Sequence, residues 1–244
     1  MGTMPVFMTA LSTILGAILF LRFGYAVGHV GLLGTLGIVL LGHLVTIPTA
    51  MAVAEIATNS KVEGGGAYYM ISRSFGLNIG AAIGIALFLS QAISVAFYVI
   101  AFAVSFEPLA DVIYHHYGVY VDNRLAGLIF MALLAMLMLS KGADIGVKAL
   151  YVVVAILLVS LGLFFIGGVY SPSSGDMTAH IENPDNFFYV FTIIFPAFTG
   201  IAAGLGLSGD LKDPKKSIPA GTMWATLVGI IVYIAVVFKL FLSA

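Results

Sequence analysis

Charged residues are confined to a few short stretches of this chain, and long apolar runs separate these stretches. Only 9% of the 244 residues are Asp, Glu, Lys or Arg, whereas 61% are hydrophobic. Soluble domains carry about 25% charged residues, and a helix of about 20 apolar residues can cross a bilayer. The sequence therefore predicts an all-α, polytopic membrane protein, because helices satisfy their own backbone hydrogen bonds in lipid.

Seven apolar runs are predicted to span the membrane, with short loops between them. They cover residues 4–28, 31–57, 77–106, 125–140, 147–169, 187–209 and 218–242. None of the loops is long enough to fold as a soluble domain. The whole chain, 1–244, is therefore predicted to be one transmembrane domain.

The distribution of Lys and Arg predicts a cytoplasmic N-terminus, because cytoplasmic loops carry an excess of these residues. With the N-terminus inside, Arg22, Arg124 and Lys239 fall outside. The other basic residues then lie inside: Lys61, Arg73, Lys141, Lys148, Lys212, Lys215 and Lys216. The acidic residues predicted outside are Glu107, Asp111, Asp122, Asp176, Glu182 and Asp185. Since no basic residue precedes Arg22, the N-terminus is expected to be mature sequence rather than a signal peptide.

The composition excludes several kinds of site. The chain has no cysteine, so it can form neither a disulfide nor a thiolate-bound metal centre. Its net charge is −1 and it has no basic cluster, which argues against a nucleic-acid partner. The predicted spans contain no nucleophile–base pair and no metal-ligand spacing, so we expect neither an enzyme nor a resident cofactor or metal.

Two of the predicted spans contain helix-breaking residues near their centres. Gly16 lies in the first span, and Gly200, preceded by Pro196, lies in the sixth. An odd number of spans reverses the direction of a repeated unit. Residues 4–169 are therefore predicted to be a first five-span repeat, and residues 187–244 the start of a second, inverted repeat. Interrupted helices at matching positions of such repeats indicate the binding site of a transporter.

Interrupted helices provide a binding site made of backbone groups. Amides at the start of the second half-helix suit an anion, and carbonyls at the end of the first half suit an alkali cation. Neither break contains Asp, Glu, Lys, Arg or His, so a cation and an anion held together would each lower the other's cost of burial. Glycines also permit close helix packing, and that is the role expected in Gly24–Gly28 and Gly76–Gly84.

Four stretches of the chain resemble the cation–chloride cotransporter family. They are residues 56–84, "ILGAILFLR" at 14–22, "VAFYVIAFA" at 95–103, and "FPAFTGIAAG" with "LSGDLKDPKKSIPAGT" within 195–222. The resemblance runs from about Leu11 to Met223 and places the chain within the amino acid–polyamine–organocation superfamily. It implies a plasma-membrane protein with a broken-helix bundle of two inverted five-span repeats, usually a homodimer, which transports chloride with potassium, sodium or both.

The resemblance also implies roles for individual residues, mostly through their main-chain atoms. The residues that match the potassium site are Thr13, Ile14, Tyr98, Pro196 and Thr199. Sodium would bind carbonyls that match Ser12 and Leu15. One chloride would lie against amides that match Gly16, Ala17 and Ile18, and a second against amides that match Gly200, Ile201 and Ala202. Tyr98 is the exception, because it would act through its hydroxyl.

Several features depart from the family pattern or stand apart from it. The chain ends after the seventh predicted span, so the second repeat lacks the last three spans of the family's fold. A complementary C-terminal half or a second copy is therefore the expected protein partner, beside the ions and the lipid bilayer. Glu55 is expected to be an interfacial structural acid rather than a gate or proton site. His43 is expected to be hydrogen-bonded within the bundle, and His115 and His116 to lie in a solvated outer loop.

The sequence favours a secondary active transporter that carries chloride with potassium, sodium or both by alternating access. One alternative is an amino acid or amine permease of the same superfamily, in which a substrate carboxylate would bind at the first break. The bulky Ile18 and Leu19 leave less room there for an amino acid. A second alternative is a membrane subunit that does not itself transport.

Overall fold

The computed structural model describes residues 1–59, 63–141, 143–168 and 181–243. Within these residues the chain is almost entirely helical and contains no β-strand. The predicted all-α class is therefore confirmed. The backbone forms two compact units, one of Met1–Met70 with Leu150–Ala244 and one of Ile71–Ala149. Lys61 and Asp176, which the sequence assigns to opposite sides of the membrane, lie outside the described residues, as does the side chain of Lys141.

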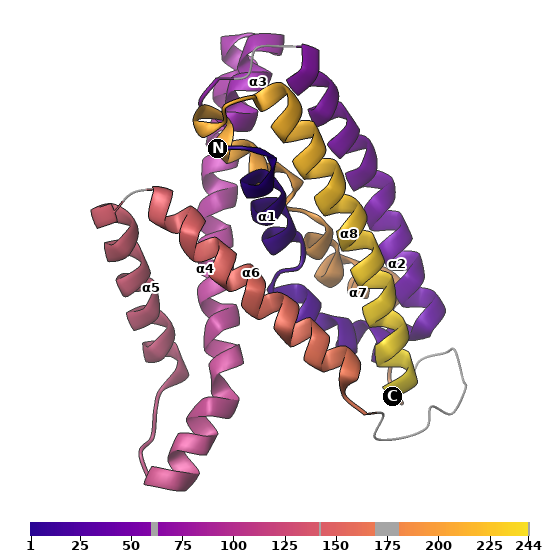
Figure 1. The fold of residues 1–244 in the computed structure, drawn as a ribbon. Helices are drawn as coiled ribbons and strands as arrows, with labels where there is room; N and C mark the ends of the chain where they lie inside the picture. Colours follow the sequence, from indigo (N-terminus) through magenta and orange to yellow (C-terminus); the bar gives the residue numbers. More distant parts are fainter. Residues whose placement is uncertain (60–62, 142, 169–180, 244) are drawn as a thin grey trace. The chain divides into compact units, whose positions relative to one another are not determined.

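Figure 1 shows the helices in chain order. They are α1 (Thr3–Ile14), α2 (Ala17–Asn59), α3 (Gly66–Phe75), α4 (Leu77–Tyr117), α5 (Asn123–Lys141), α6 (Ala143–Ile166), α7 (Phe187–Ile194), the 3-10 helices η1 (Phe195–Phe198) and η2 (Ile201–Asp210), and α8 (Pro214–Ser243).

In the described part of the chain, five helical segments are long and apolar enough to cross a membrane. They are Thr3–Asn59, Leu77–Tyr117, Lys148–Ile166, Phe187–Asp210 and Pro214–Ser243, with Asn123–Leu137 as a shorter apolar helix. The first would be roughly 85 Å long if straight, far more than a bilayer core of about 30 Å. Gly31 divides it, because its φ of 68° and ψ of −173° are not helical. The predicted spans 4–28 and 31–57 meet near this residue.

The prediction that the third span ends at residue 106 and is followed by an outer loop is wrong for the first part of that loop. Helix α4 continues to Tyr117 and ends where Gly118 adopts a left-handed conformation, with φ of 67°, and donates its N–H to the Tyr114 carbonyl at 2.8 Å. His115 and His116 therefore occupy the last turn of a helix rather than a loop. No residue between Pro108 and Gly118 breaks a helix, so the turn-forming glycine sets the boundary.

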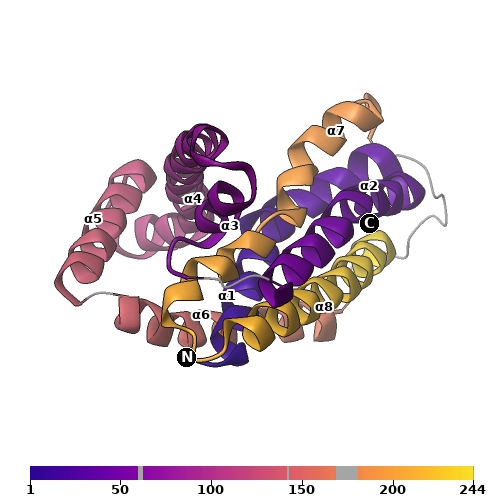
Figure 2. The same cartoon turned by 90° about the horizontal axis from the view of Figure 1, so that it is seen from above.

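The first unit is built around the short helix α1, which contacts α8 and η2, while α2 and α8 pack along one another (Figures 1 and 2). Leu15, Phe23, Phe198 and Tyr233 are fully buried in its core. Three glycines permit the close contacts. A Cβ on Gly42 would lie 2.1 Å from the Phe198 ring, and Cβ atoms on Gly221 and Gly229 would lie 2.7 Å from Val6 and Ile14.

The glycines that the sequence assigns to packing differ among themselves. A Cβ on Gly28 would lie 3.1 Å from Ile181, and one on Gly80 would lie 2.5 Å from Ser72. Both glycines therefore serve close packing, as predicted. Among the described residues Gly24 has no heavy atom within 4 Å of its Cβ position, so a packing role for that residue stays a prediction.

The second unit is held together by α4 and α5, which pack along one another. The rings of Phe102 and Phe130 stack with their centroids 4.4 Å apart and their planes at 8°. Gly127 of α5 faces α4, and its Cβ position lies at van der Waals contact distance, 3.4 Å, from the carbonyl oxygen of Val99. Aromatic stacking and a small residue at the contact thus join the two helices.

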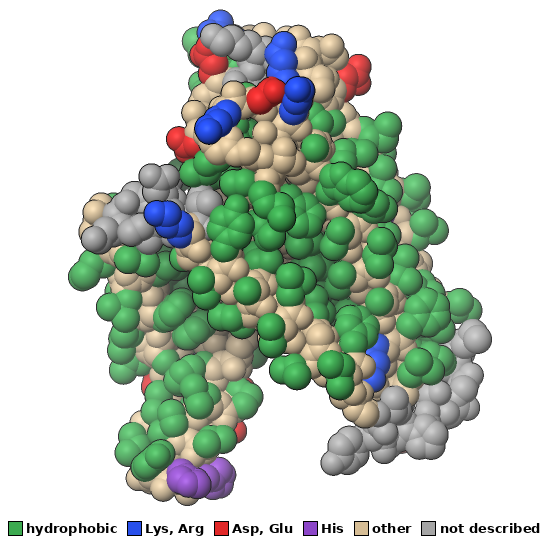
Figure 3. All heavy atoms as spheres, in the orientation of Figure 1, with side chains coloured by type: hydrophobic (Ala, Val, Ile, Leu, Met, Phe, Trp, Pro, Cys, Tyr) green, Lys and Arg blue, Asp and Glu red, His purple; other side chains and the backbone are tan. Residues whose placement is uncertain are grey.

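Apolar side chains cover much of the surface in Figure 3, and a group of charged side chains lies at its upper end. Three lysines lie at the start of α8. Lys212, Lys215 and Lys216 are all exposed there, and Lys216 lies 4.0 Å from Asp213. Such an apolar surface bounded by charged residues is typical of a helix that spans a bilayer.

Candidate ion-binding site

The first helix break separates α1 from α2. The last hydrogen bond of α1 joins the N–H of Leu15 to the Leu11 carbonyl at 2.8 Å, and Leu15 leaves the helix with ψ of 44°. Helix α2 begins at Ala17. Because a helix end leaves carbonyls without intrahelical donors and a helix start leaves amides without acceptors, the break presents both kinds of backbone group within a few residues.

The hydroxyl groups beside this break point back into α1. Ser12 donates to the carbonyl of Thr9 at 3.0 Å, and Thr13 donates to the same carbonyl at 2.8 Å. Neither hydroxyl proton is therefore offered to the break itself. The polar groups that α1 and the start of α2 leave at the break are therefore main-chain carbonyls and amides.

The second break lies between η1 and η2. Thr199 is extended, with ψ of 174°, and Gly200 has φ of 111° and ψ of −8°, which belongs to the left-handed region. Only glycine adopts this region without strain. The segment after the break is a ten-residue 3-10 helix, in which Ala203 donates to the Gly200 carbonyl at 2.9 Å. The sixth predicted span is thus an α-helix only up to Ile194.

The carbonyl of Pro196, expected to bind a cation, already accepts two hydrogen bonds. The N–H of Thr199 lies 3.2 Å from it, and the Thr199 hydroxyl donates to it at 2.7 Å. A carbonyl oxygen has two lone pairs. In this structure both are used within η1, so a cation at Pro196 would replace the hydroxyl.

The two breaks lie against one another. A Cβ built on Gly200 would be 2.7 Å from Cγ2 of Thr13, 3.0 Å from its Cβ and 3.2 Å from its carbonyl carbon. Positions that are far apart in the sequence, one expected to hold a cation and the other an anion, are therefore in direct contact.

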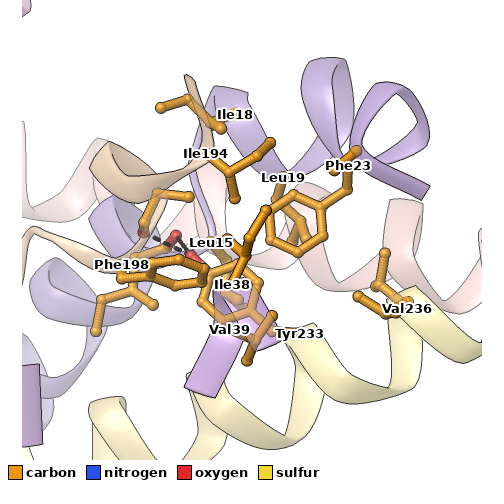
Figure 4. Packing of buried hydrophobic residues seen from close by; sticks show 14 of the residues in the cluster. Leu15, Ile18, Leu19, Phe23, Ile38, Val39, Ile194, Phe198, Tyr233 and Val236 are labelled. Carbon is orange, nitrogen blue, oxygen red and sulfur yellow. Dashed lines mark hydrogen bonds between the residues drawn. The ribbon is translucent and has the colours of Figure 1, made fainter. Parts of the chain in front are cut away.

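Tyr233 of α8 joins the two breaks and was not among the residues expected from the sequence. Its hydroxyl lies within hydrogen-bonding distance of the carbonyl oxygens of Ile14 and Ala197, 2.6 Å from the second (Figure 4). Its ring stacks on Phe23, with centroids 5.1 Å apart, and meets Phe198 edge-on at 5.2 Å. A lone phenol in the middle of an apolar span was the available signal, because a buried tyrosine hydroxyl requires a partner.

The expected chloride residues are placed at the starts of α2 and η2. Gly16, Ala17 and Gly200 are half-buried, Ile18 and Ile201 have buried side chains, and Ala202 is exposed. Of the expected sodium residues, Leu15 has a fully buried side chain and Ser12 is half-buried.

Tyr98 belongs to the second unit, whereas the other expected site residues belong to the first. Within its own unit it lies on α4, where its ring meets that of Phe97 edge-on with centroids 5.7 Å apart. The structure thus brings the first-break and sixth-span residues together within the first unit, whereas Tyr98 lies on α4 of the second unit.

A polar cluster fixes the segment that leads into α7. Tyr25 donates to a carboxylate oxygen of Asp185, and the Asp185 N–H donates to Nδ1 of His29 at 2.9 Å. Asn186 then caps α7 by accepting the N–H of Tyr189 at 2.8 Å. These bonds tie the first half of α2 to the start of the interrupted sixth span.

Two further ionisable residues, His43 and Glu55, lie outside the two helix breaks. Nδ1 of His43 lies 2.7 Å from the Val39 carbonyl, and the ring is buried 5.0 Å from that of Phe198, which confirms the predicted hydrogen-bonded position inside the bundle. Glu55 is exposed near the end of α2. In the described part of the chain no three His, Asp or Glu side chains gather as a metal site would require.

Comparison with known proteins shows which family the sequence matches. The family model named amino acid permease matches residues 5–243. Solute carrier family 12 member 1 of Mus musculus is 38% identical over 95% of this chain, and member 2 of Homo sapiens is 34% identical over 95%. Member 2 of Squalus acanthias is 36% identical over 93%.

The chain spans about a fifth of the length of these relatives, between 20% and 23%. The resemblance to the cation–chloride cotransporters, drawn from the motifs, is confirmed at the level of the family, since the relatives are members of solute carrier family 12. A permease family is one of transporters rather than enzymes. The chain belongs to the amino acid permease family.

Proposed function

We propose that this chain forms part of a secondary active transporter that moves chloride together with potassium, sodium or both by alternating access. The observation that carries the proposal is the contact between the two helix breaks at Thr13 and Gly200. Neither break contains a charged side chain. Neutral backbone dipoles that face one another suit a cation and an anion bound close together, because each ion lowers the other's cost of burial.

The anion sites would be the starts of the two second half-helices. Amides of Gly16, Ala17 and Ile18 would hold one chloride at the positive end of α2. Those of Gly200, Ile201 and Ala202 would hold the other at the start of η2. Free N–H groups and the helix dipole both favour negative charge at such a position.

The cation site would be formed by carbonyl groups. Potassium would bind the carbonyls of Thr13 and Ile14, together with Pro196, Thr199 and the hydroxyl of Tyr98. Sodium would bind the carbonyls of Ser12 and Leu15. The hydroxyls of Ser12 and Thr13 turn toward Thr9, which supports carbonyl rather than hydroxyl coordination at the first break.

The transporter would use two inverted repeats, with residues 4–169 as the first and 187–244 as the start of the second. Both repeats would then begin with an interrupted helix, as α1 with α2 and α7 with η1 and η2 do. The remaining spans would come from a complementary C-terminal half, or the chain would act with a second copy. It would lie in the plasma membrane with its N-terminus and the three exposed lysines at the start of α8 on the cytoplasmic side.

A second candidate function is the permease of amino acids or amines, which the description of the matching family favours. A substrate carboxylate would then occupy the amides at the start of α2. Ile18 and Leu19, beside those amides, are 8% and 3% exposed. Their bulk leaves less room for an organic substrate than for an inorganic ion.

The test is rubidium uptake into liposomes that contain the purified protein, alone and with a complementary C-terminal half. Uptake that requires chloride and is lost when gluconate replaces it would support cotransport of cation and chloride. Uptake of amino acids that does not depend on chloride would support the permease instead. Protein that moves none of these solutes in either preparation would indicate a subunit without transport activity.

A further inference from the structure

Tyr233 occupies the point where the carbonyl ends of both interrupted helices meet. Its side chain is 0% exposed. The ring lies nearly parallel to Phe23, at 14°, and edge-on to Phe198, at 79°. Because a phenol oxygen lies in the plane of its ring, this packing fixes where the hydroxyl points. Figure 4 shows the ring held between the two phenylalanines.

The hydroxyl faces two carbonyl oxygens but carries one proton. Its partners are the carbonyls of Ile14, at the end of α1, and Ala197, in η1. A phenol can donate to only one acceptor fully, so the second carbonyl faces a lone pair of the phenol oxygen. Three oxygen atoms therefore converge in a buried place with a single proton between them, and each carbonyl oxygen keeps at least one lone pair for a further positive partner.

A cation at the first break would be such a partner. If the ion binds the Ile14 carbonyl, the Tyr233 hydroxyl can donate to Ala197 alone, and each carbonyl then has one positive partner. The residues needed for this exchange are in place without any movement of the backbone, because the hydroxyl already contacts both oxygens.

We propose that Tyr233 is a positioning residue for the transported cation. Its hydroxyl holds the Ile14 and Ala197 carbonyls in place before the ion arrives. The cation then binds to two breaks that are already ordered, which lowers the free-energy cost of binding. The inference rests on the proposed function, because it requires a cation at the first break. It predicts a role in cation affinity for a residue of α8.

Tyr233→Phe tests the proposal, because it removes the hydroxyl and keeps the ring. The measurement is the potassium concentration that gives half of the potassium-dependent rise in melting temperature of the purified protein. We expect this midpoint to increase about fivefold, as the loss of one hydrogen bond of about 1 kcal/mol requires. The chloride midpoint, measured at saturating potassium, should not change.

Tyr25→Phe is the matched control. It removes another tyrosine hydroxyl hydrogen bond of the first unit, the one that joins α2 to Asp185 just before α7. A general loosening of the first unit would shift the potassium midpoint in both variants. The proposal requires a shift in Tyr233→Phe alone.

Tyr233→p-aminophenylalanine provides the rescue. Its amine has two N–H groups and can donate to both carbonyls at once, so the potassium midpoint should stay within about twofold of wild type. This variant also decides the matter if Tyr233→Phe does not fold. The role of Tyr233 would be overturned if the potassium midpoint of the amine variant were also raised about fivefold. It would equally be overturned if Tyr233→Phe kept the wild-type midpoint. Wild-type protein without any potassium-dependent stabilisation would instead refute the proposed cation site itself.

Discussion

Gly200 lies directly against Thr13, and this contact brings the two interrupted helices together. Any side chain at position 200 would begin 2.7 Å from Cγ2 of Thr13. The residue also has φ of 111°, which an L side chain rarely adopts. Both the space and the backbone angle therefore require glycine, and the geometry of the candidate site depends on it.

Gly200→Ala should lower the free energy of unfolding by at least about 2 kcal/mol, through backbone strain and overpacking against Thr13. Thermal melting of the purified protein in detergent measures the effect. Gly206→Ala is the control, since Gly206 lies in η2, the 3-10 helix that follows Gly200, with nothing within 4 Å of its Cβ position. Equal melting temperatures for the two variants would show that the contact is not as tight as described.

Gly42→Ala should destabilise the protein by about 1–3 kcal/mol, because its methyl would overlap the Phe198 ring, 2.1 Å from the nearest ring atom. A smaller side chain at position 198 should relieve the overlap. Phe198→Leu is therefore expected to cost less in the Gly42→Ala background than in wild type. Strictly additive changes in a double-mutant cycle of melting measurements would contradict this packing.

Ser208→Ala should release the loop after α2 from η2 without unfolding the bundle. The Ser208 hydroxyl accepts the Gly66 N–H at 3.2 Å and donates to the Glu63 carbonyl at 2.9 Å. Hydrogen exchange at the Gly66 amide should speed up several-fold while the melting temperature changes little. Thr58→Ala, which loses only hydroxyl bonds within α2, should leave that exchange rate unchanged. An equal rate in Ser208→Ala would mean that the serine does not hold the loop.

Tyr98→Phe should raise the potassium or rubidium concentration for half-maximal uptake by about fivefold, if its hydroxyl binds the cation as proposed. Tyr114→Phe removes a hydroxyl from the same helix, α4, and should have no effect. Concentration dependence of rubidium uptake into liposomes distinguishes them. Unchanged affinity in Tyr98→Phe would remove this residue from the site.

The sequence contains enough information to predict the helical membrane class and the places where helices break. Glycine and proline act locally, so Gly16 and Gly200 indicate interruptions without any knowledge of tertiary contacts. The same local reasoning misplaces the end of α4, since Glu107 and His115 look like loop residues although nothing before Gly118 stops the helix. Charge alone does not end a helix.

The position of Tyr233 in an apolar span indicates a buried hydroxyl that needs a partner, but it does not identify the partner, because the role of Tyr233 depends on contacts with residues distant in the chain. Its hydroxyl partners lie 36 and 219 positions away. Nothing in the sequence of α8 indicates that the two carbonyl ends converge on that side chain. The 3-10 geometry of η2 is similarly absent from the local pattern, which is compatible with an α-helix containing glycine.

The most direct test of the central claim is a crystal structure of the protein soaked in rubidium bromide, with both ions located by anomalous scattering. We expect rubidium beside the carbonyls of Thr13 and Ile14, and bromide beside the amides at the starts of α2 and η2. Absence of anomalous signal at both breaks, or signal from the two ions only at other places, would contradict the claim that the interrupted helices bind a cation and an anion together.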